Sequence, residues 1–347
     1  MLFEVFFISL HKRKYYIKME QTPIEIKQLR GRFVDDYNLP CSLVISPYFE
    51  DRLELMERDY GAKTKYDNLL VLIKERFDNS PNKFLEEYHK VRNNIITTVL
   101  NSEAYKDFIS NDKYLVNDFK PICSSKNLYT NEQDGGLFLS FDMKKANFQT
   151  LRYANPAIVF DCNTYEDFIG KFTDLDYVKE SKYTRQVIFG KLNPKRTMRL
   201  EQSITNEFAS ELIASAMRFC GICIIERFTP FSLKTDEIIF KFDGSEEEFE
   251  KLKLEPTIEY DGITYKVSKF KLHARQFKLA TSSSILTVYE KEDYLNARRR
   301  ILKGVPATYY PQVDKLLRGE KINSQSDLIF YYEHELCQFL NPLELIK

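Results

Sequence analysis

Apolar side chains recur every three or four residues along the first third of the chain, a spacing typical of amphipathic helices. Ser80-Pro81 is a favourable helix start, because serine can cap free backbone amides and proline is tolerated in the first turn. The apolar residues that follow share one face, namely Phe84, Tyr88, Val91, Ile95 and Val99. We therefore predict that the region from about 60 to 120 is helical.

The pattern changes beyond a polar stretch that contains Pro and Gly and reads as a loop, residues 120–135. Residues 137–142 (LFLSFD) form a short apolar run that ends in an acid, which predicts a strand. Residues 164–189 have helical spacing, and residues 203–219 place their apolar side chains on one face of a packed helix. Residues 222–242 are rich in Ile and Phe and predict strands.

Three further segments complete the pattern. Residues 245–253 (SEEEFEKLK) begin with serine and three glutamates, the charge pattern of a helix N-terminus. Residues 257–267 surround Asp261-Gly262, a strong hairpin signal. Residues 290–345 are expected to be mostly helical. The order of elements predicts an α+β fold.

We expect three regions along the chain. Residues 1–125 form a helical region, residues 126–255 form a mixed core, and residues 256–347 add the hairpin and helices that complete the sheet domain. A chain of 347 residues is long enough for one large or two modest domains with a real core.

Charge excludes one function class. The chain has 51 Lys and Arg against 51 Asp and Glu, so its formal net charge is zero. A protein that coats nucleic acid by bulk electrostatics would be strongly basic. Any site for a polyanion must therefore be a local patch.

The cysteines and the N-terminus indicate a cytoplasmic protein. Cys220 and Cys223 form a C-x-x-C pair, but no second ligand pair for zinc lies nearby, so buried free thiols in a reducing compartment are expected. The apolar run MLFEVFFISL is half the length of a membrane span and is followed, not preceded, by basic residues. No membrane association is predicted.

Three segments carry candidate chemistry. Residues 135–153 contain Asp142 at the end of an apolar strand, and residues 231–242 contain Asp236 in a strand-rich stretch. Two such acids on neighbouring strands lie about 5 Å apart, the spacing of strands in a sheet. Carboxylates at that separation can hold a pair of divalent ions for phosphoryl transfer, and oxygen ligands favour magnesium (Mg2+).

The third segment lies between the two acids and is basic. Residues 179–199 contain seven basic residues and one acid. On a helix, Lys182, Arg185 and Phe189 lie on one face. The two cations could neutralise a triphosphate, and Phe189 could stack on a base.

The order of these motifs resembles the polymerase domain of family A DNA polymerases and their single-subunit RNA polymerase relatives. The strand that ends in Asp142, followed by Lys-Lys-Ala-Asn147, is similar to their first motif. Arg185 precedes Phe189-Gly by the spacing of their finger helix, and Thr235-Asp236-Glu237 is similar to their His-Asp-Glu motif. The resemblance covers residues 135–255 approximately.

The resemblance implies a right-hand architecture with an antiparallel palm sheet, a helical thumb and short fingers. It implies a template-directed nucleotidyltransferase in which Asp142 and Asp236 bind two Mg2+ ions and Glu237 is an accessory acid. Its partners would be a nucleic-acid primer-template and nucleoside triphosphates, with accessory proteins as further candidates. Lys182 and Arg185 would bind the triphosphate.

This sequence departs from the family at several positions. Asn147 replaces the Glu that helps to exclude a ribose 2′-hydroxyl, so acceptance of ribonucleotides is expected. Thr235 replaces the His of the last motif, and Asn193-Pro194 replaces the aromatic-Gly pair that closes the finger helix.

Two alternatives belong to other functional classes. A catalytically inactive, polymerase-derived protein would bind nucleic acid or act as an accessory factor, with an affinity that falls with salt. In an interaction protein unrelated to nucleic acid, Asp142 and Asp236 would cap turns, residues 179–199 would be a solvated face and Phe189 would be a core residue.

Overall fold

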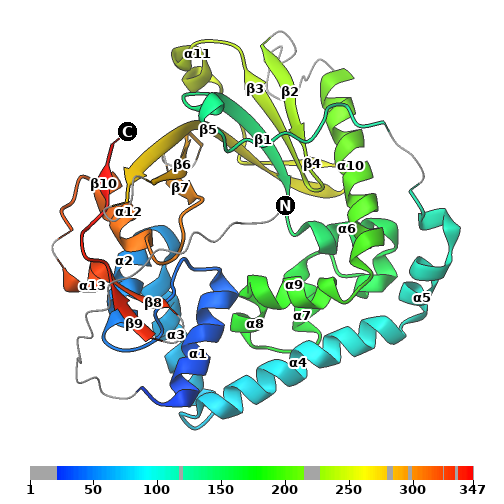
Figure 1. Cartoon of the computed structure of the whole chain (residues 1–347). Coiled ribbons are helices and arrows are strands. Elements are labelled where there is room, and N and C mark those ends of the chain that lie inside the picture. The colour runs from blue at the N-terminus through cyan, green and yellow to red at the C-terminus, as the bar shows by residue number, and fades with distance from the viewer. Residues whose placement is uncertain are drawn as a thin grey trace.

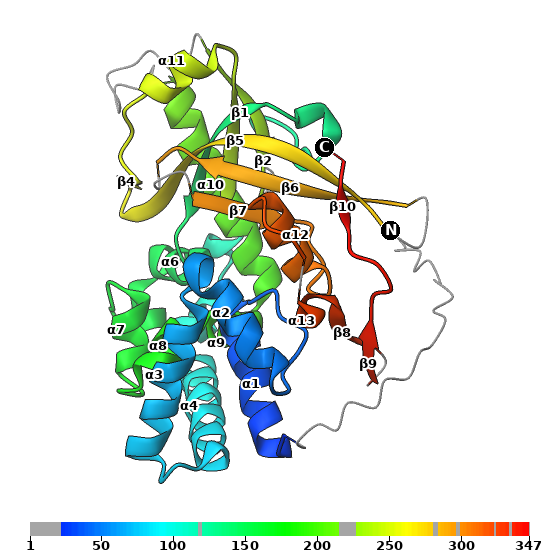
Figure 2. The ribbon, with the colours of Figure 1, turned by 90° about the vertical axis from the view of Figure 1, so that its left-hand side faces the viewer.

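The computed structural model describes residues 22–116, 120–214, 227–279, 284–295, 299–322, 324–332 and 335–346. Helices from the first half of the chain lie on one side, and an antiparallel sheet lies on the other (Figure 1). The view from the side shows the same two halves, one above the other (Figure 2). The predicted α+β class with an antiparallel sheet is confirmed at this level.

The first helices are α1 (Ile24–Tyr37), α2 (Tyr48–Tyr60), α3 (Ala62–Arg76), α4 (Pro81–Asn101) and α5 (Glu103–Ser110). The predicted start of α4 is confirmed, because the Ser80 hydroxyl accepts a hydrogen bond from the backbone amide of Lys83. The predicted apolar stripe of α4 is confirmed as well, since its five residues from Phe84 to Val99 are all buried.

The next helices pack against this first group. They are α6 (Ala146–Ala154), α7 (Tyr165–Gly170), α8 (Asp176–Glu180) and α9 (Lys182–Gly190), as expected for residues 164–189. One hydrophobic core runs from Leu29 in α1 to Leu192 just after α9. Helices before and after the predicted boundary at residue 125 therefore contribute buried side chains to the same hydrophobic core.

The main sheet has the strand order β2-β3-β1-β5-β6-β7, and β4 and β10 also pair with β5. All of these pairs are antiparallel. The strands are β1 (Leu137–Met143), β2 (Phe228–Leu233), β3 (Glu237–Phe242), β4 (Thr257–Tyr260), β5 (Ile263–Lys278), β6 (Ile285–Asp293), β7 (Arg299–Lys303) and β10 (Glu344–Leu345).

Two helices cover one face of this sheet. Phe208 of α10 (Pro194–Ala214) and Phe249 of α11 (Glu246–Lys251) belong to a core that also contains Leu139 and Phe141 of β1. Because side chains alternate along a strand, Ser140 and Asp142 face the opposite side. The sheet therefore presents Asp142 on the face that α10 and α11 do not cover.

Two hairpins follow from local sequence. β4 and β5 join at Asp261-Gly262, where both residues have positive φ angles of 47° and 72°, as the predicted tight turn requires. β2 and β3 join through Lys234–Asp236, so the second predicted acid lies in a turn at the end of the sheet.

The expectation that residues 290–345 are mostly helical is wrong. The described part of this stretch contains the end of β6, β7, β10 and a second two-stranded sheet of β8 (Ile329–Tyr332) and β9 (Glu335–Gln338). Its helices are short, namely α12 (Tyr310–Leu317) and α13 (Gln325–Leu328). The cause is the length of β5, which has sixteen residues. Its second half pairs with residues 285–293, and this pairing makes them the strand β6.

The described residues include the free thiols of Cys41 and Cys162, which are buried as expected, and those of Cys123 and Cys337, which are partly exposed. Cys220 and Cys223 lie outside the described residues, as does the N-terminal apolar run. Across the ranges that the structure describes, no helix is both long enough and apolar enough to cross a membrane.

Candidate active site

Asp142 and Asp236 are brought together by backbone pairing. β1 and β3 are adjacent and antiparallel, and Asp142 lies directly opposite Glu237 in their register. The amide of Met143 donates a 2.8 Å hydrogen bond to the carbonyl oxygen of Asp236. The two segments that carry the predicted acids, far apart in the sequence, are therefore neighbours at one end of the sheet.

The acids raise one another's proton affinity. Burial, and then the negative charges of Glu237 and Asp236, raise the pKa of Asp142 to about 6. Burial and the charge of Glu237 also raise the pKa of Asp236. Among the described residues, neither Asp142 nor Asp236 forms an ion pair, whereas Glu237 is paired with Lys234 at 3.0 Å. Negative charge is thus left available to a cation.

A cavity of about 860 Å³ opens beside the two acids. Its lining includes Asp142, Asp236, Asn147, Lys182 and Arg185. These residues come from β1, the β2–β3 turn, α6 and α9, so the cavity lies between the sheet and the helices. Five of the seven predicted site residues therefore share one cavity, whose lining also includes Lys266 of β5 and Glu166 of α7.

Glu237 and Phe189 are placed elsewhere. Glu237 points to the uncovered sheet face and lines a neighbouring cavity with Asp142. Phe189 is only 3% exposed, and its ring lies 6.2 Å from that of Tyr165 and 6.5 Å from that of Phe168. Phe189 therefore belongs to the helical core, as the alternative interpretation expected, and is not available to stack on a base.

Tyr165 is an aromatic residue of the cavity lining that contacts its cations. Its ring lies beneath two cations, with Lys145 Nζ at 5.4 Å and the Arg185 guanidinium at 5.7 Å from the ring centre. Such contacts hold a guanidinium over an aromatic face. Tyr165 thus helps to direct Arg185 into the cavity. Nothing in the sequence distinguishes it from the other 21 tyrosines.

Glu201 is an acid that sequence reasoning missed. This residue of α10 is 5% exposed, and burial and the charges of Asp236 and Asp142 raise its pKa to about 8. It lies on the same helix face as the buried Ile204 and Phe208. A glutamate within an otherwise apolar stripe is the signal that could have identified it.

Gln149 fixes the helix that carries Asn147. The Gln149 side chain donates a 3.0 Å hydrogen bond to the carbonyl of Thr264 in β5 and accepts one of 2.7 Å from the Thr264 amide. It also donates to the Lys144 carbonyl at the end of β1. These bonds join the start of α6 to two strands and set the position of Asn147 beside Asp142.

The candidate metal ligands of this cavity are carboxylate oxygens. In the described part of the chain, no group of three or more His, Cys, Asp or Glu residues is arranged to hold a metal ion. Magnesium is commonly held by one or two carboxylates together with water and substrate phosphates. The unpaired carboxylates of Asp142 and Asp236, whose pKa values are raised by burial and neighbouring acids, match that requirement.

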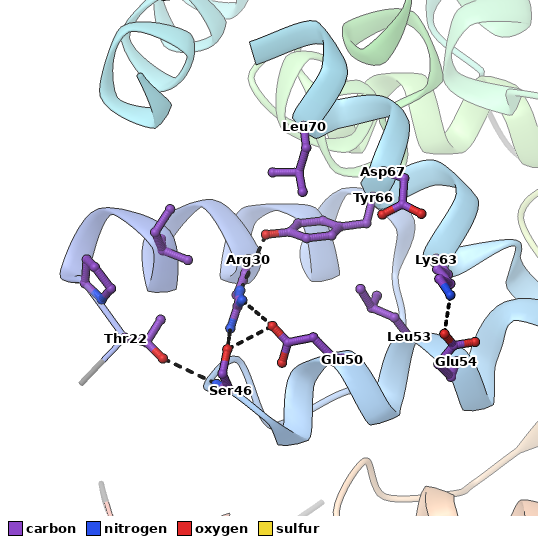
Figure 3. Close-up of a pocket in the computed structure, with 12 residues that line it drawn as sticks. Thr22, Arg30, Ser46, Glu50, Leu53, Glu54, Lys63, Tyr66, Asp67 and Leu70 are labelled. Carbon is purple, nitrogen blue, oxygen red and sulfur yellow. Dashed lines mark hydrogen bonds and ion pairs between the residues drawn. The ribbon is translucent and has the colours of Figure 1, made fainter. Parts of the chain in front are cut away.

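A separate cavity of about 510 Å³ lies between α1, α2 and α3 (Figure 3). Arg30, one of its charged lining residues, contacts Glu50 at 2.5 Å and Ser46 at 3.0 Å, and the Arg30 Nε donates a hydrogen bond to the Tyr66 hydroxyl. These contacts join α1, α2 and α3 and already satisfy the hydrogen-bond donors of the Arg30 guanidinium. None of the predicted site residues lines this cavity.

Comparison of the chain with protein-family models, curated protein sequences and solved structures finds no match.

Proposed function

We propose that this protein is a magnesium-dependent nucleotidyltransferase that adds nucleotides to the 3′ end of a nucleic-acid strand under the direction of a template. The observation that carries the proposal is the cavity shared by Asp142, Asp236, Asn147, Lys182 and Arg185. These residues were predicted from three separate segments of the sequence, and their meeting in one cavity was not required by the secondary structure alone.

The arrangement of elements supports a right-hand architecture. A strand ending in Asp142 lies beside a hairpin whose turn carries Asp236, in the order of the polymerase motifs that the sequence resembles. In this proposal the antiparallel sheet is the palm, α9 is a short finger helix, and the helices of residues 22–116 are the thumb.

Each side chain has a role that its position allows. Lys182 and Arg185 bind the triphosphate and neutralise the charge that develops on the departing pyrophosphate. In this proposal Asn147, which lines the same cavity, contacts the sugar of the incoming nucleotide. Asp142 and Asp236 would hold magnesium, which supplies charge stabilisation for the attacking and leaving oxygens. Glu237, paired with Lys234, is an accessory acid.

The reaction is a displacement at phosphorus. The 3′-oxygen of the acceptor forms a bond to the α-phosphorus, the bond from that phosphorus to the bridging oxygen breaks, and pyrophosphate leaves. The hydroxyl proton passes to water. The protein contributes position and charge, as expected for phosphoryl transfer.

A primer-extension assay tests the proposal. Wild type, Asp142→Asn and Asp236→Asn are compared with magnesium and with EDTA, using Asp243→Asn as the control because Asp243 is exposed at the opposite end of β3. We expect incorporation by wild type and the control, and a loss of at least 100-fold in the two site variants.

Two outcomes contradict the proposal in different ways. If wild type binds primer-template in a salt-dependent manner but incorporates nothing, the protein is a non-catalytic binding protein. If the site variants incorporate nucleotides as wild type does, the reaction takes place elsewhere and the site assignment fails.

A further inference from the structure

The neighbouring cavity that Glu237 and Asp142 line has a volume of about 390 Å³ and lies on the sheet face that α10 and α11 leave uncovered. Its lining includes four lysines, Lys234, Lys266, Lys291 and Lys303. They come from the β2–β3 turn, β5, β6 and β7, so four separate elements direct ammonium groups to one place. The proposed mechanism gives none of these lysines a role, although Lys266 also lines the catalytic cavity.

Strand register explains why the lysines meet. Lys266 lies opposite Asp142, and Lys291 lies between Leu272 of β5 and Ile301 of β7. Side chains in register across a sheet share a face. These lysines therefore stand on the same surface as Asp142, and the register that sets Asp142 beside Glu237 also sets Lys266 on its other side.

Three of the four lysines have no ion pair within the described residues. Lys234 is paired with Glu237, whereas Lys266, Lys291 and Lys303 contact no described carboxylate within 4.0 Å. Lys291 instead lies over aromatic rings, with its Nζ 4.2 Å from the centre of Phe270 and 5.6 Å from that of Tyr129.

Burial and mutual repulsion disfavour the charged form of the lysines in this cavity. Burial lowers the pKa of Lys291, and desolvation and the charge of Lys291 lower the pKa of Lys303. The acids that face these groups are Asp142, Glu237 and Asp293, and their negative charge offsets part of this effect. An anion placed among the three unpaired ammonium groups would relieve their mutual repulsion.

We propose that this cavity binds a backbone phosphate of the acceptor strand close to its 3′ end. Asp142 and Lys266 line both cavities, so ligands held in the two would meet at Asp142. With the triphosphate against Lys182 and Arg185, the lysine cavity is the side from which the 3′-oxygen arrives. The identity of the ligand as an acceptor strand rests on the proposed function.

Binding of a fluorescein-labelled single-stranded oligonucleotide, measured by anisotropy in EDTA without nucleotide, tests the site separately from turnover. We expect Lys291→Met and Lys303→Met each to weaken binding 5- to 20-fold and to reduce its salt dependence. Lys251→Met is the control, because Lys251 is exposed on α11, on the other side of the sheet. Binding by both site variants equal to wild type would overturn the proposal.

A second arm needs no change in the protein. Each of the three linkages nearest the 3′ end is replaced in turn by an uncharged methylphosphonate. We expect one replacement to weaken binding to wild type but not to the Lys291→Met, Lys303→Met double variant. Equal weakening in both proteins, or none in either, overturns the proposal.

Competition identifies the source of the phosphate. If inorganic pyrophosphate displaces the oligonucleotide from wild type, and this competition is lost in the Lys291→Met and Lys303→Met variants, the cavity is a site for free diphosphate. That result would overturn the assignment to the acceptor strand. Oligonucleotide binding that depends on these lysines, together with absent primer extension, would support the site and contradict the proposed function.

Discussion

The carboxylate of Asp36 in α1 accepts a 2.7 Å hydrogen bond from the hydroxyl of Ser181, the residue that caps the N-terminus of α9. The hydroxyls of Tyr88 and Tyr177 also donate to this carboxylate, at 2.6 and 2.7 Å. Asp36 is fully buried, so these three donors replace its hydration. The bonds fix the start of the helix that carries Lys182 and Arg185.

Asp36→Asn tests this relationship. The amide nitrogen of asparagine cannot accept the bonds that one carboxylate oxygen accepts, and hydrogen bonds to a charged group contribute about 1.5–3 kcal/mol. We expect the free energy of unfolding in urea to fall by about 2–4 kcal/mol. Asp35→Asn, at the exposed neighbouring position, should change it by less than about 0.5 kcal/mol. Equal effects of the two substitutions would contradict this account.

Arg185→Ala should weaken nucleotide binding. The guanidinium lines the cavity and is held over Tyr165, so its removal leaves part of the triphosphate charge without a partner. We expect the KM for nucleotide to rise 10- to 100-fold in primer extension, at about 1.4 kcal/mol per tenfold. The matched control is Lys191→Ala, because Lys191 is exposed just beyond α9 and is not part of the cavity lining. A larger effect in the control would reject the assignment.

Glu201 predicts a pH dependence of stability. The native pKa of about 8 lies above the ordinary value of 4.5, so between these pH values the unfolded chain releases a proton that the folded protein retains. The free energy of unfolding therefore falls as pH rises through this window.

Glu201→Gln should remove this contribution. The native pKa of about 8 and the ordinary value of 4.5 differ by about 3.5, which at about 1.36 kcal/mol per pKa unit corresponds to about 5 kcal/mol over the whole titration. Relative to wild type, the variant should gain roughly 4 kcal/mol of this between pH 4.5 and pH 8, because the group is half-titrated at each end of that window. Urea denaturation in EDTA measures the gain, and Glu207→Gln, at an exposed position of the same helix, is the control. A stability difference that does not change with pH would show that Glu201 is already ionised in the folded protein.

Asn147 predicts relaxed sugar selectivity. Asn147 aligns with a glutamate in the first motif of the family A polymerases that the sequence resembles, and it lines the cavity beside Asp142. We expect wild type to incorporate ribonucleotides and deoxyribonucleotides within about tenfold of one another. Asn147→Glu should reduce ribonucleotide incorporation at least tenfold, whereas Asn147→Gln should have little effect. Strict use of deoxyribonucleotides by wild type would refute this interpretation.

Local sequence predicted many of the elements before the far half of β5. The stripe of α4, the strand that ends in Asp142 and the Asp261-Gly262 turn each depend on neighbours within a few residues. The strands after residue 285 depend on pairing with β5, a contact between distant segments that periodicity does not report. Helical spacing was therefore an insufficient guide there.

The same distinction applies to the site. Asp142 and Asp236 could be identified because each follows an apolar run, and their proximity follows from the pairing of β1 with β3. Phe189 shares a helix face with Lys182, but the end of α9 is buried beneath α7, which the face alone did not indicate. Tyr165 enters the cavity lining through tertiary packing, so no local pattern marks it.

The common core of α1, α4 and α9 has a mechanical consequence. Lys182 and Arg185 of the cavity lining belong to the helical half of the molecule, whereas Asp142 and Asp236 belong to β1 and the β2–β3 turn. Because α9 is bonded to α1 through Asp36 and Ser181, it cannot swing inward alone as a separate finger. A change in the width of the cavity would therefore require the helices of this common core to move together relative to the sheet, and not α9 alone.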